Sequence, residues 1–245
     1  MPLTSTYFVL NAWRHGEGSP EGFNLLIVYG PLRVGKSAYA FKTGAEVLQQ
    51  LYSLDTKEAW DKLKHYIIFH PKQFFRKMEW MEKKNIERIP FLIWDDAGLW
   101  LFYLKWYDPF LVAFLQELNV IGTRIASLIF TTPSPKFILR KIREFPEAIN
   151  VRILDKNKKG EPWQRVAKGY KHWQLPSGQS RVRNIFIDEF SCRMPNVFFR
   201  WYKPLRDSYE KLTRNVLQET WEKLQEKSGA NQNLDFNLDE NGDFR

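Results

Sequence analysis

The sequence predicts an α/β fold in which helices cover both faces of a mostly parallel sheet of five strands. Short apolar runs that suit buried strands alternate with helical segments as far as residue 154. A glycine-containing loop joins the first of these strands to the first helix. The chain has 245 residues, 44% of them hydrophobic, which is enough for one large domain with an extension.

Five apolar runs are the expected strands, because each is short and rich in aliphatic or aromatic side chains. They are residues 25–29, 65–69, 91–94, 125–130 and 148–154. Helices are expected over residues 37–51, 56–64, from 71 onward, 108–118 and 135–143. Pro71 and Pro109 suit the first position of a helix, where the missing N–H has no intrahelical partner to lose. Residues 1–22 are turn-rich and are expected to lead into the first strand.

The pattern changes after residue 154, so we expect a domain over residues 1–154 and an extension over 155–227. Turn signals at residues 156–162 and 176–178 separate short β-like runs, which predicts one or two hairpins. A long helix is expected over residues 202–227. Residues 228–245 are polar and acidic and are expected to be a disordered tail.

The net charge of +9 is distributed unevenly along the chain. Residues 1–135 carry a net +2, residues 136–227 a net +10, and the last 18 residues a net −3. A strongly basic segment favours a polyanionic partner, most simply nucleic acid. A solvated basic surface without a partner is the alternative.

The cysteine content and the hydropathy pattern exclude several classes of protein. The single cysteine, Cys192, excludes an internal disulfide framework and a four-cysteine metal site. No leader sequence is recognisable at the start of the chain. The most apolar stretch, residues 110–132, is interrupted by charged and amide side chains, so we expect no membrane span.

Residues 30–37 match the phosphate-binding pattern GxxxxGK[ST] and lie where its chemistry requires, between a strand and a helix. The glycines let the backbone direct successive N–H groups at phosphate oxygens, and the helix start adds the positive end of its dipole. Lys36 can reach the β and γ phosphates, and the hydroxyl of Ser37 can hold Mg²⁺. The residues expected to bind ATP are Gly30, Pro31, Leu32, Arg33, Val34, Gly35, Lys36, Ser37 and Ala38.

Two acids, Asp95 and Asp96, end the apolar run of residues 91–94. Ligands of open parallel sheets bind at the carboxyl ends of the strands. We expect Asp95 in the Mg²⁺ shell and Asp96 to orient or activate the attacking water. A helix cap or an Asx turn is the structural alternative, and Asp188–Glu189, after another apolar run, is a competing acid pair.

Other polar side chains are candidates to complete a hydrolytic site. Thr131 and Thr132 end the expected strand at residues 125–130, and either can contact the γ-phosphate and the water. Arg140 and Arg143 follow on the next expected helix, a place from which an arginine can reach the site of a neighbouring subunit. A simple turn after the strand and ordinary solvated arginines are the alternatives.

These motifs resemble those of AAA+ and related ASCE P-loop ATPases, over about residues 20–150. The matching segments are residues 30–37, FLIWDD at 91–96 and IFTT at 129–132. The chain resembles most the DnaA-like initiators and helicase loaders of archaeal viruses and plasmids. The resemblance implies ATP and Mg²⁺ as cofactors, a homo-oligomer with shared ATP sites, and a location in the cytoplasm of the host if the chain is viral. Asp96 departs from the family, where Glu is more usual.

We therefore predict a Mg²⁺-dependent ATPase that acts on DNA, in replication initiation, helicase loading or translocation. Basic and aromatic side chains interleave beyond residue 164, as in Tyr170, His172 and Trp173, a composition that suits contacts with phosphates and bases. These aromatics can equally belong to the core. A small-molecule or nucleotide kinase is the alternative enzyme, and a nucleotide switch without hydrolysis is the alternative outside enzymes.

Overall fold

The computed structural model describes residues 2–14, 22–102, 107–156, 161–174 and 180–228. The chain forms two compact units, residues 1–198 and residues 199–245. The boundary expected after residue 154 lies inside a strand of the first unit. The expected acidic tail, residues 228–245, lies outside the described residues except for Ser228.

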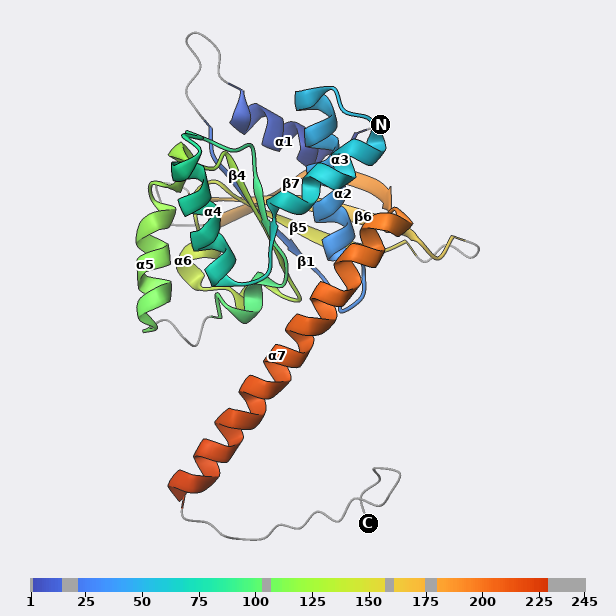
Figure 1. The fold of residues 1–245 in the computed structure, drawn as a ribbon. Helices are drawn as coiled ribbons and strands as arrows, with labels where there is room; N and C mark the ends of the chain where they lie inside the picture. Colours follow the sequence, from blue (N-terminus) through green and yellow to red (C-terminus); the bar gives the residue numbers. More distant parts are fainter. Residues whose placement is uncertain (1, 15–21, 103–106, 157–160, 175–179, 229–245) are drawn as a thin grey trace. The chain divides into compact units, whose positions relative to one another are not determined.

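The first unit contains one mixed sheet, seen in Figure 1. Its strand order is β2-β3-β4-β1-β5-β6-β7. The five strands from β2 to β5 are parallel to their neighbours, as the sequence predicts. β6 and β7 are antiparallel and continue the sheet, so it has seven strands rather than five. The bounds are β1 Asn24–Tyr29, β2 Ile67–Ile68, β3 Leu92–Trp94, β4 Ser127–Thr132, β5 Ala148–Asp155, β6 Gln164–Gln174 and β7 Ser180–Ser191.

The predicted helices are present between the strands, and Pro71 and Pro109 begin α4 and α5 as expected. The helices are α1 Thr4–Trp13, α2 Lys36–Tyr52, α3 Thr56–Leu63, α4 Pro71–Lys83, α5 Pro109–Leu118 and α6 Arg140–Arg143. Asp108 caps α5, because its Oδ1 accepts the backbone N–H of Phe110 at 2.8 Å. Residues 135–143, expected as one helix, form a 3₁₀ turn over Pro135–Phe137 and the short α6.

Helix α1 occupies much of the start of the chain, which the sequence did not predict to be helical, while the turn signals at residues 15–20 lie outside the described residues. Its Ser5 and Thr6 are buried. The Ser5 hydroxyl bonds the Thr43 hydroxyl of α2 at 2.6 Å, and the Thr6 hydroxyl donates to the Glu46 carboxylate of α2 at 2.7 Å. Buried polar groups with hydrogen-bond partners are tolerated inside a protein. Because polar side chains occupy part of its buried face, this helix could not be recognised from the spacing of apolar residues.

The two faces of the sheet are covered by different helices. The indole of Trp94 meets the rings of Phe74 on α4 and Phe114 on α5, at centroid distances of 6.2 and 5.7 Å. Phe91 lies against α2, where a Cβ at Gly44 would come within 2.9 Å of its ring. Side chains alternate between faces along a strand, so α2 and the α4–α5 pair lie on opposite sides.

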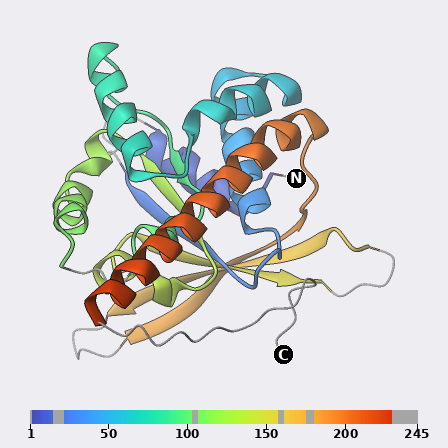
Figure 2. The ribbon, with the colours of Figure 1, turned by 60° about the horizontal axis from the view of Figure 1, so that its bottom comes forward.

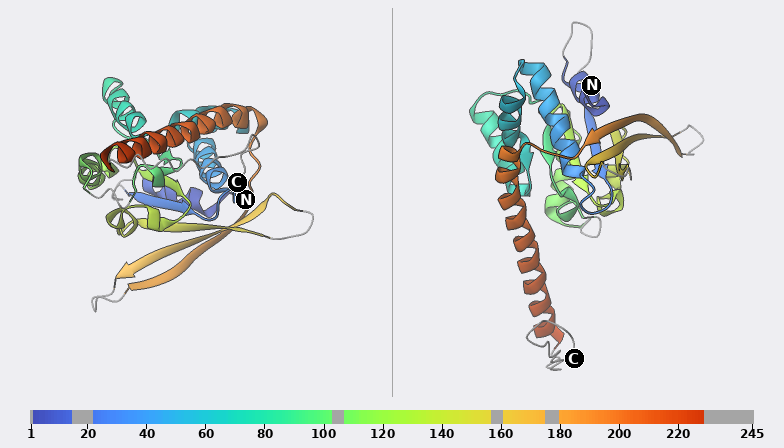
Figure 3. Two further views of the ribbon diagram at one scale, coloured as in Figure 1. Left: turned by 90° about the horizontal axis from the view of Figure 1, so that it is seen from below. Right: turned by 90° about the vertical axis from the view of Figure 1, so that its right-hand side faces the viewer.

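The β6–β7 hairpin extends the sheet as a long two-stranded ribbon, drawn in yellow to orange (Figures 2 and 3). Asp188 of β7 is buried and ties this ribbon to α1 and α2. Its carboxylate accepts the N–H of Thr4 at 3.0 Å, the Thr4 hydroxyl at 2.6 Å and the Tyr39 hydroxyl at 2.6 Å. Glu189 pairs with Lys156. The competing acid pair is thus engaged in structural contacts.

Helix α7, Asn196–Ser228, begins in the first unit and forms the described part of the second. At its start, Phe198 packs against Phe41 and Trp60 with centroid distances of 5.4 and 4.7 Å. The helix predicted over residues 202–227 is confirmed and starts six residues earlier. Within the described residues, no helix combines the length and apolar character that crossing a bilayer requires.

Asp188→Ala is expected to lower the free energy of unfolding by about 3 kcal/mol, because it removes hydrogen bonds to a charged, buried acceptor. Urea unfolding followed by circular dichroism measures the change. Glu189→Ala is the matched control and should cost at most about 1 kcal/mol, as its ion pair is partly exposed. Equal losses in the two variants would contradict the structural role given to Asp188.

Candidate nucleotide site

The phosphate loop connects the end of β1 at Tyr29 to the start of α2 at Lys36. Two of its positions require glycine. Gly30 has a φ of 153°, and a Cβ there would lie 2.6 Å from the carbonyl oxygen of Ile153. Gly35, the N-cap of α2, is left-handed with a φ of 102°. Only glycine adopts these conformations without strain, which explains both fixed glycines of the motif.

The ammonium of Lys36 is held over the backbone of its own loop. Its Nζ donates to the carbonyl oxygens of Gly30 at 3.2 Å and Pro31 at 2.8 Å. The side chain is buried, with 7% of the residue exposed. An anionic oxygen forms stronger hydrogen bonds to an ammonium than a carbonyl does, so a phosphate in the loop can replace these partners.

The loop presents its tip and the start of α2 to a ligand. Pro31, Leu32 and Arg33 are exposed, and Ser37 is half-buried. The first N–H groups of a helix, here those around Lys36 to Ala38, have no acceptor within the helix. This arrangement can bind an anionic group through backbone N–H donors and the helix dipole.

Asp95 and Asp96 follow the end of β3 and share one hydroxyl, that of Thr131 on β4. The Thr131 Oγ1 donates to Asp95 Oδ1 at 2.6 Å, and the backbone N–H of Asp96 donates to the same Oγ1 at 2.8 Å. Asp95 is 1% exposed, and its N–H donates to the Ile68 carbonyl of β2 at 2.9 Å. Asp96 is half-buried and has a left-handed backbone, with a φ of 52°.

The strand register brings the loop and the acids to one edge of the sheet. Val28 of β1 pairs with Thr131 of β4, and Phe130 of β4 pairs with Trp94 of β3. All three strands are parallel, so the loop after β1 and Asp95 after β3 leave at the same end. Adjacent strands lie about 4.8 Å apart, which separates the β1 and β3 backbones by roughly 10 Å. The fold is of the P-loop NTPase type.

The two threonines at the end of β4 differ in their contacts. The Thr132 hydroxyl donates to the Ser134 carbonyl at 3.0 Å, which is a local turn contact. Thr132 also lies against Gly98, where a Cβ would come within 2.5 Å of its Oγ1. Thr131 is therefore the threonine that joins the acid pair at the P-loop edge.

Arg140 and Arg143 lie on α6 and line a groove with Tyr29 and Arg152. The Nε of Arg140 donates to both carboxylate oxygens of Glu144 at 2.9 Å. The Arg140 side chain is 77% exposed. The expected role of these arginines in the site of a neighbouring subunit stays a prediction.

Two contacts to the P-loop come from the β6–β7 hairpin, and sequence reasoning missed both. Arg165 of β6 donates its Nε to the Val34 carbonyl at 3.0 Å and pairs with Asp155 at 3.3 Å. Cys192, after β7, packs so closely that a Cβ at Gly35 would lie 2.8 Å from its own Cβ. Arg165 belongs to the basic and aromatic segment beyond residue 164, and a separation of 131 residues hides its contact with Val34 from sequence reasoning.

The donor set at this edge suits Mg²⁺ bound together with a triphosphate. Across the part of the chain that the structure describes, no group of three or more His, Cys, Asp or Glu side chains could hold a metal ion. Mg²⁺ is usually bound by one or two carboxylates together with substrate phosphates. A hydroxyl at Ser37 and a carboxylate at Asp95 fit that kind of site.

Comparisons with known proteins find a viral protein of similar sequence. It is 29% identical over 203 residues to the uncharacterised protein B-251 of Sulfolobus spindle-shape virus 1, covering 81% of this chain and 80% of that protein. No protein-family model matches. The resemblance to DnaA-like proteins stays a prediction.

Among solved structures, similar ones include the genome-packaging NTPase B204 of Sulfolobus turreted icosahedral virus 2 (12% identity, 66% of this chain, 96% of that chain, TM-score 0.39). Another is the N-terminal domain of zonular occludens toxin from Neisseria meningitidis (13% identity, 68% and 95% covered, TM-score 0.38). Since these scores lie below 0.5, the assignment of the fold rests on the sheet order and the P-loop of this chain.

Thr131→Val is expected to lower the free energy of unfolding by about 1–3 kcal/mol, because the buried Asp95 then loses a hydrogen-bond donor. Thr131→Ser keeps the hydroxyl and should lose less than half as much. Thr132→Val, at the next position of β4, is a second control and should cost less than Thr131→Val, because the Thr132 hydroxyl makes only a local contact with Ser134. Urea unfolding of the three variants tests this ranking, and an undiminished stability of Thr131→Val would contradict it.

Arg165→Ala is expected to raise the dissociation constant of a fluorescent ATP analogue about tenfold, because the P-loop loses the donor that holds Val34. A tenfold change corresponds to about 1.4 kcal/mol. Arg181→Ala removes an equal charge from an exposed position of β7 and should leave the dissociation constant unchanged. Titration by fluorescence anisotropy measures both, and equal affinities of the two variants would refute a role for Arg165.

Proposed function

We propose that this chain is a Mg²⁺-dependent ATPase that acts on DNA, encoded by a virus or a plasmid-like element. One observation carries the hydrolytic part. The Thr131 hydroxyl joins Asp95 and Asp96 at the sheet edge from which the P-loop emerges. A phosphate cradle, a carboxylate for a metal and a second carboxylate for water are the parts that such a reaction needs.

The P-loop would hold the triphosphate through its backbone. N–H groups at the start of α2 would bind the β-phosphate, and Lys36 would exchange its carbonyl partners for β- and γ-phosphate oxygens. Ser37 and Asp95 would hold Mg²⁺, which neutralises charge that develops on the phosphate oxygens. Thr131 fixes the Asp95 carboxylate in one orientation.

Asp96 would position the attacking water. Its backbone is left-handed and its N–H donates to the Thr131 hydroxyl, which holds Asp96 beside Asp95. In the reaction the water oxygen bonds to the γ-phosphorus while the bond to the β–γ bridging oxygen breaks. ADP leaves with that electron pair, and a proton of the water passes to Asp96 before it reaches the phosphate product or solvent.

The DNA-directed part rests on charge and on the expected assembly. Residues 136–227 carry a net charge of +10, which favours a polyanionic partner. In a homo-oligomer, Arg140 or Arg143 of one subunit would stabilise the transition state in the next. An arginine supplied in this way raises turnover by about 10³ or more.

Lys36→Ala and Asp96→Asn are each expected to lower kcat for ATP by at least about 10², because they remove phosphate binding and water activation respectively. Phosphate release in the presence of Mg²⁺ measures the rates. Removal of Mg²⁺ with a chelator should abolish the activity of the wild type.

Two surface variants serve as matched controls for this experiment. Lys57→Ala and Asp61→Asn change the same charges on exposed positions of α3 and should keep the wild-type rate. Full activity of Asp96→Asn would overturn its role. Transfer of the phosphate to a small acceptor in place of water would replace the ATPase by a kinase.

A further inference from the structure

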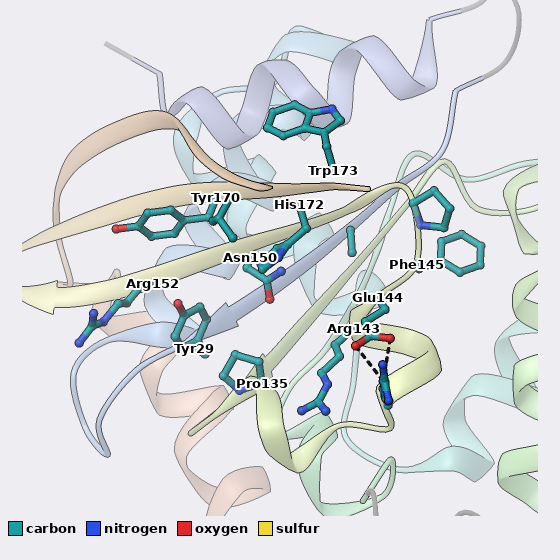
Figure 4. A pocket seen from close by; sticks show the side chains of 14 residues that line it. Tyr29, Pro135, Arg143, Glu144, Phe145, Asn150, Arg152, Tyr170, His172 and Trp173 are labelled. Atoms are coloured by element: carbon teal, nitrogen blue, oxygen red, sulfur yellow. Dashed lines mark hydrogen bonds and ion pairs between the residues drawn. The ribbon is translucent and has the colours of Figure 1, made fainter. Parts of the chain in front are cut away.

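A groove of about 950 Å³ lies on the sheet beside α6 (Figure 4). Its floor and walls include Tyr29 of β1, Asn150 and Arg152 of β5, and Tyr170 and His172 of β6. These residues share one face of the sheet, because they alternate by two along each strand and pair across strands. Tyr29 is opposite Arg152, and Asn150 is opposite Tyr170.

The residues that line the groove carry a net charge of +2, from three arginines and one glutamate. The arginines are Arg140, Arg143 and Arg152. The acid among the lining residues, Glu144, is engaged by Arg140 through both of its oxygens. Exposed arginines along a groove neutralise the phosphates of a nucleic-acid backbone.

Aromatic side chains line the groove together with these arginines. Figure 4 shows the rings of Tyr29 and Tyr170 near the side chains of Asn150 and Arg152, whereas the Trp173 indole lies on the other side of β6. Burial raises the pKa of Tyr29, and the charge of Arg152 acts in the opposite direction. The phenol therefore stays protonated at neutral pH and can donate a hydrogen bond.

We propose that this groove binds a single strand of nucleic acid, with Arg152 on the backbone phosphates and Tyr170 stacked on an unpaired base. Rings and arginines that line a groove suit unpaired bases, whose faces are open, better than a duplex. The inference rests on the proposed function, since it names the surface at which the ATPase takes its DNA. It adds a site separate from the P-loop.

The groove is connected to the P-loop through two strands. Tyr29 directly precedes Gly30, the first residue of the loop. β6 carries Tyr170 in the groove and Arg165 at the Val34 carbonyl. A strand bound in the groove thus contacts the elements that hold the P-loop, and we expect it to change the rate of ATP hydrolysis.

Anisotropy of a labelled oligothymidine of about 20 nucleotides, long enough for one binding site, tests the proposal. Tyr170→Ala should raise its dissociation constant about tenfold, within the range found for the loss of one stacked base. Arg152→Ala should weaken binding by a similar factor, because a phosphate loses its positive partner. Tyr170→Phe keeps the ring and should bind almost as the wild type does, which separates stacking from misfolding. Arg143 is left unchanged because hydrolysis also depends on it in the proposed function.

Lys171→Ala is the matched control, since it removes a positive charge from the same strand on the opposite face. It should bind within about twofold of the wild type, which is small beside the tenfold effect of a lost stacked base. Equal affinities of all four variants, strictly competitive displacement of the strand by ATP, or equal affinity for duplex and single strand would each overturn the proposal.

Oligonucleotide binding and ATP hydrolysis, measured on the same proteins, distinguish the proposed groove from the proposed ATPase activity. If the wild type hydrolyses ATP and binds no oligonucleotide, the groove and the DNA-directed part of the function are both wrong and the ATPase stands. If the groove variants lose the oligonucleotide while the wild type hydrolyses no ATP, the groove stands and the ATPase is wrong.

Discussion

The hydroxyl of Thr131 is the group on which the candidate site depends. It donates to Asp95 and accepts from the backbone N–H of Asp96, and the side chains of Thr131 and Asp95 are almost completely buried. A buried carboxylate without partners is costly, so this hydrogen bond allows an acid to stand at the end of a fully apolar strand. Thr131 also pairs with Val28 of β1, two residues before the P-loop. The same residue therefore fixes the position of the two acids along the strand direction relative to the P-loop.

The β6–β7 hairpin is part of this arrangement rather than a separate module. Strand β5 would otherwise be an exposed sheet edge, and β6 covers it over the whole length of β5 from Ile149. The pairing carries Arg165 to the Val34 carbonyl. Asp188 then anchors the second strand to α1 and α2. The P-loop is therefore held from β1, from α2 and from the hairpin.

The local parts of this structure could be predicted from the sequence, and the long-range contacts could not. Apolar runs and the phosphate motif identified five strands, because buried parallel strands and a tight glycine loop leave strong local patterns. The helix at Thr4–Trp13 was missed because its buried Ser5 and Thr6 depend on partners in α2. Likewise, no local pattern distinguishes an arginine that binds the P-loop, Arg165, from one on a basic surface. The choice between Thr131 and Thr132 also required the register of β4 against β3.

The candidate nucleotide site and the basic groove lie on one sheet, and this placement determines how the two could be coupled. Parallel strands are stiff along their length, and β1 ends in the groove at Tyr29 before it enters the P-loop at Gly30. Arg165 joins a second strand of the groove to the same loop. A ligand that shifts β6 by a fraction of an ångström changes the hydrogen bond at Val34, and no hinge or domain movement is needed. Coupling of this kind requires the hairpin to be part of the same sheet as the P-loop strand, as it is here. A basic segment that formed a separate domain could not act on the P-loop in this way.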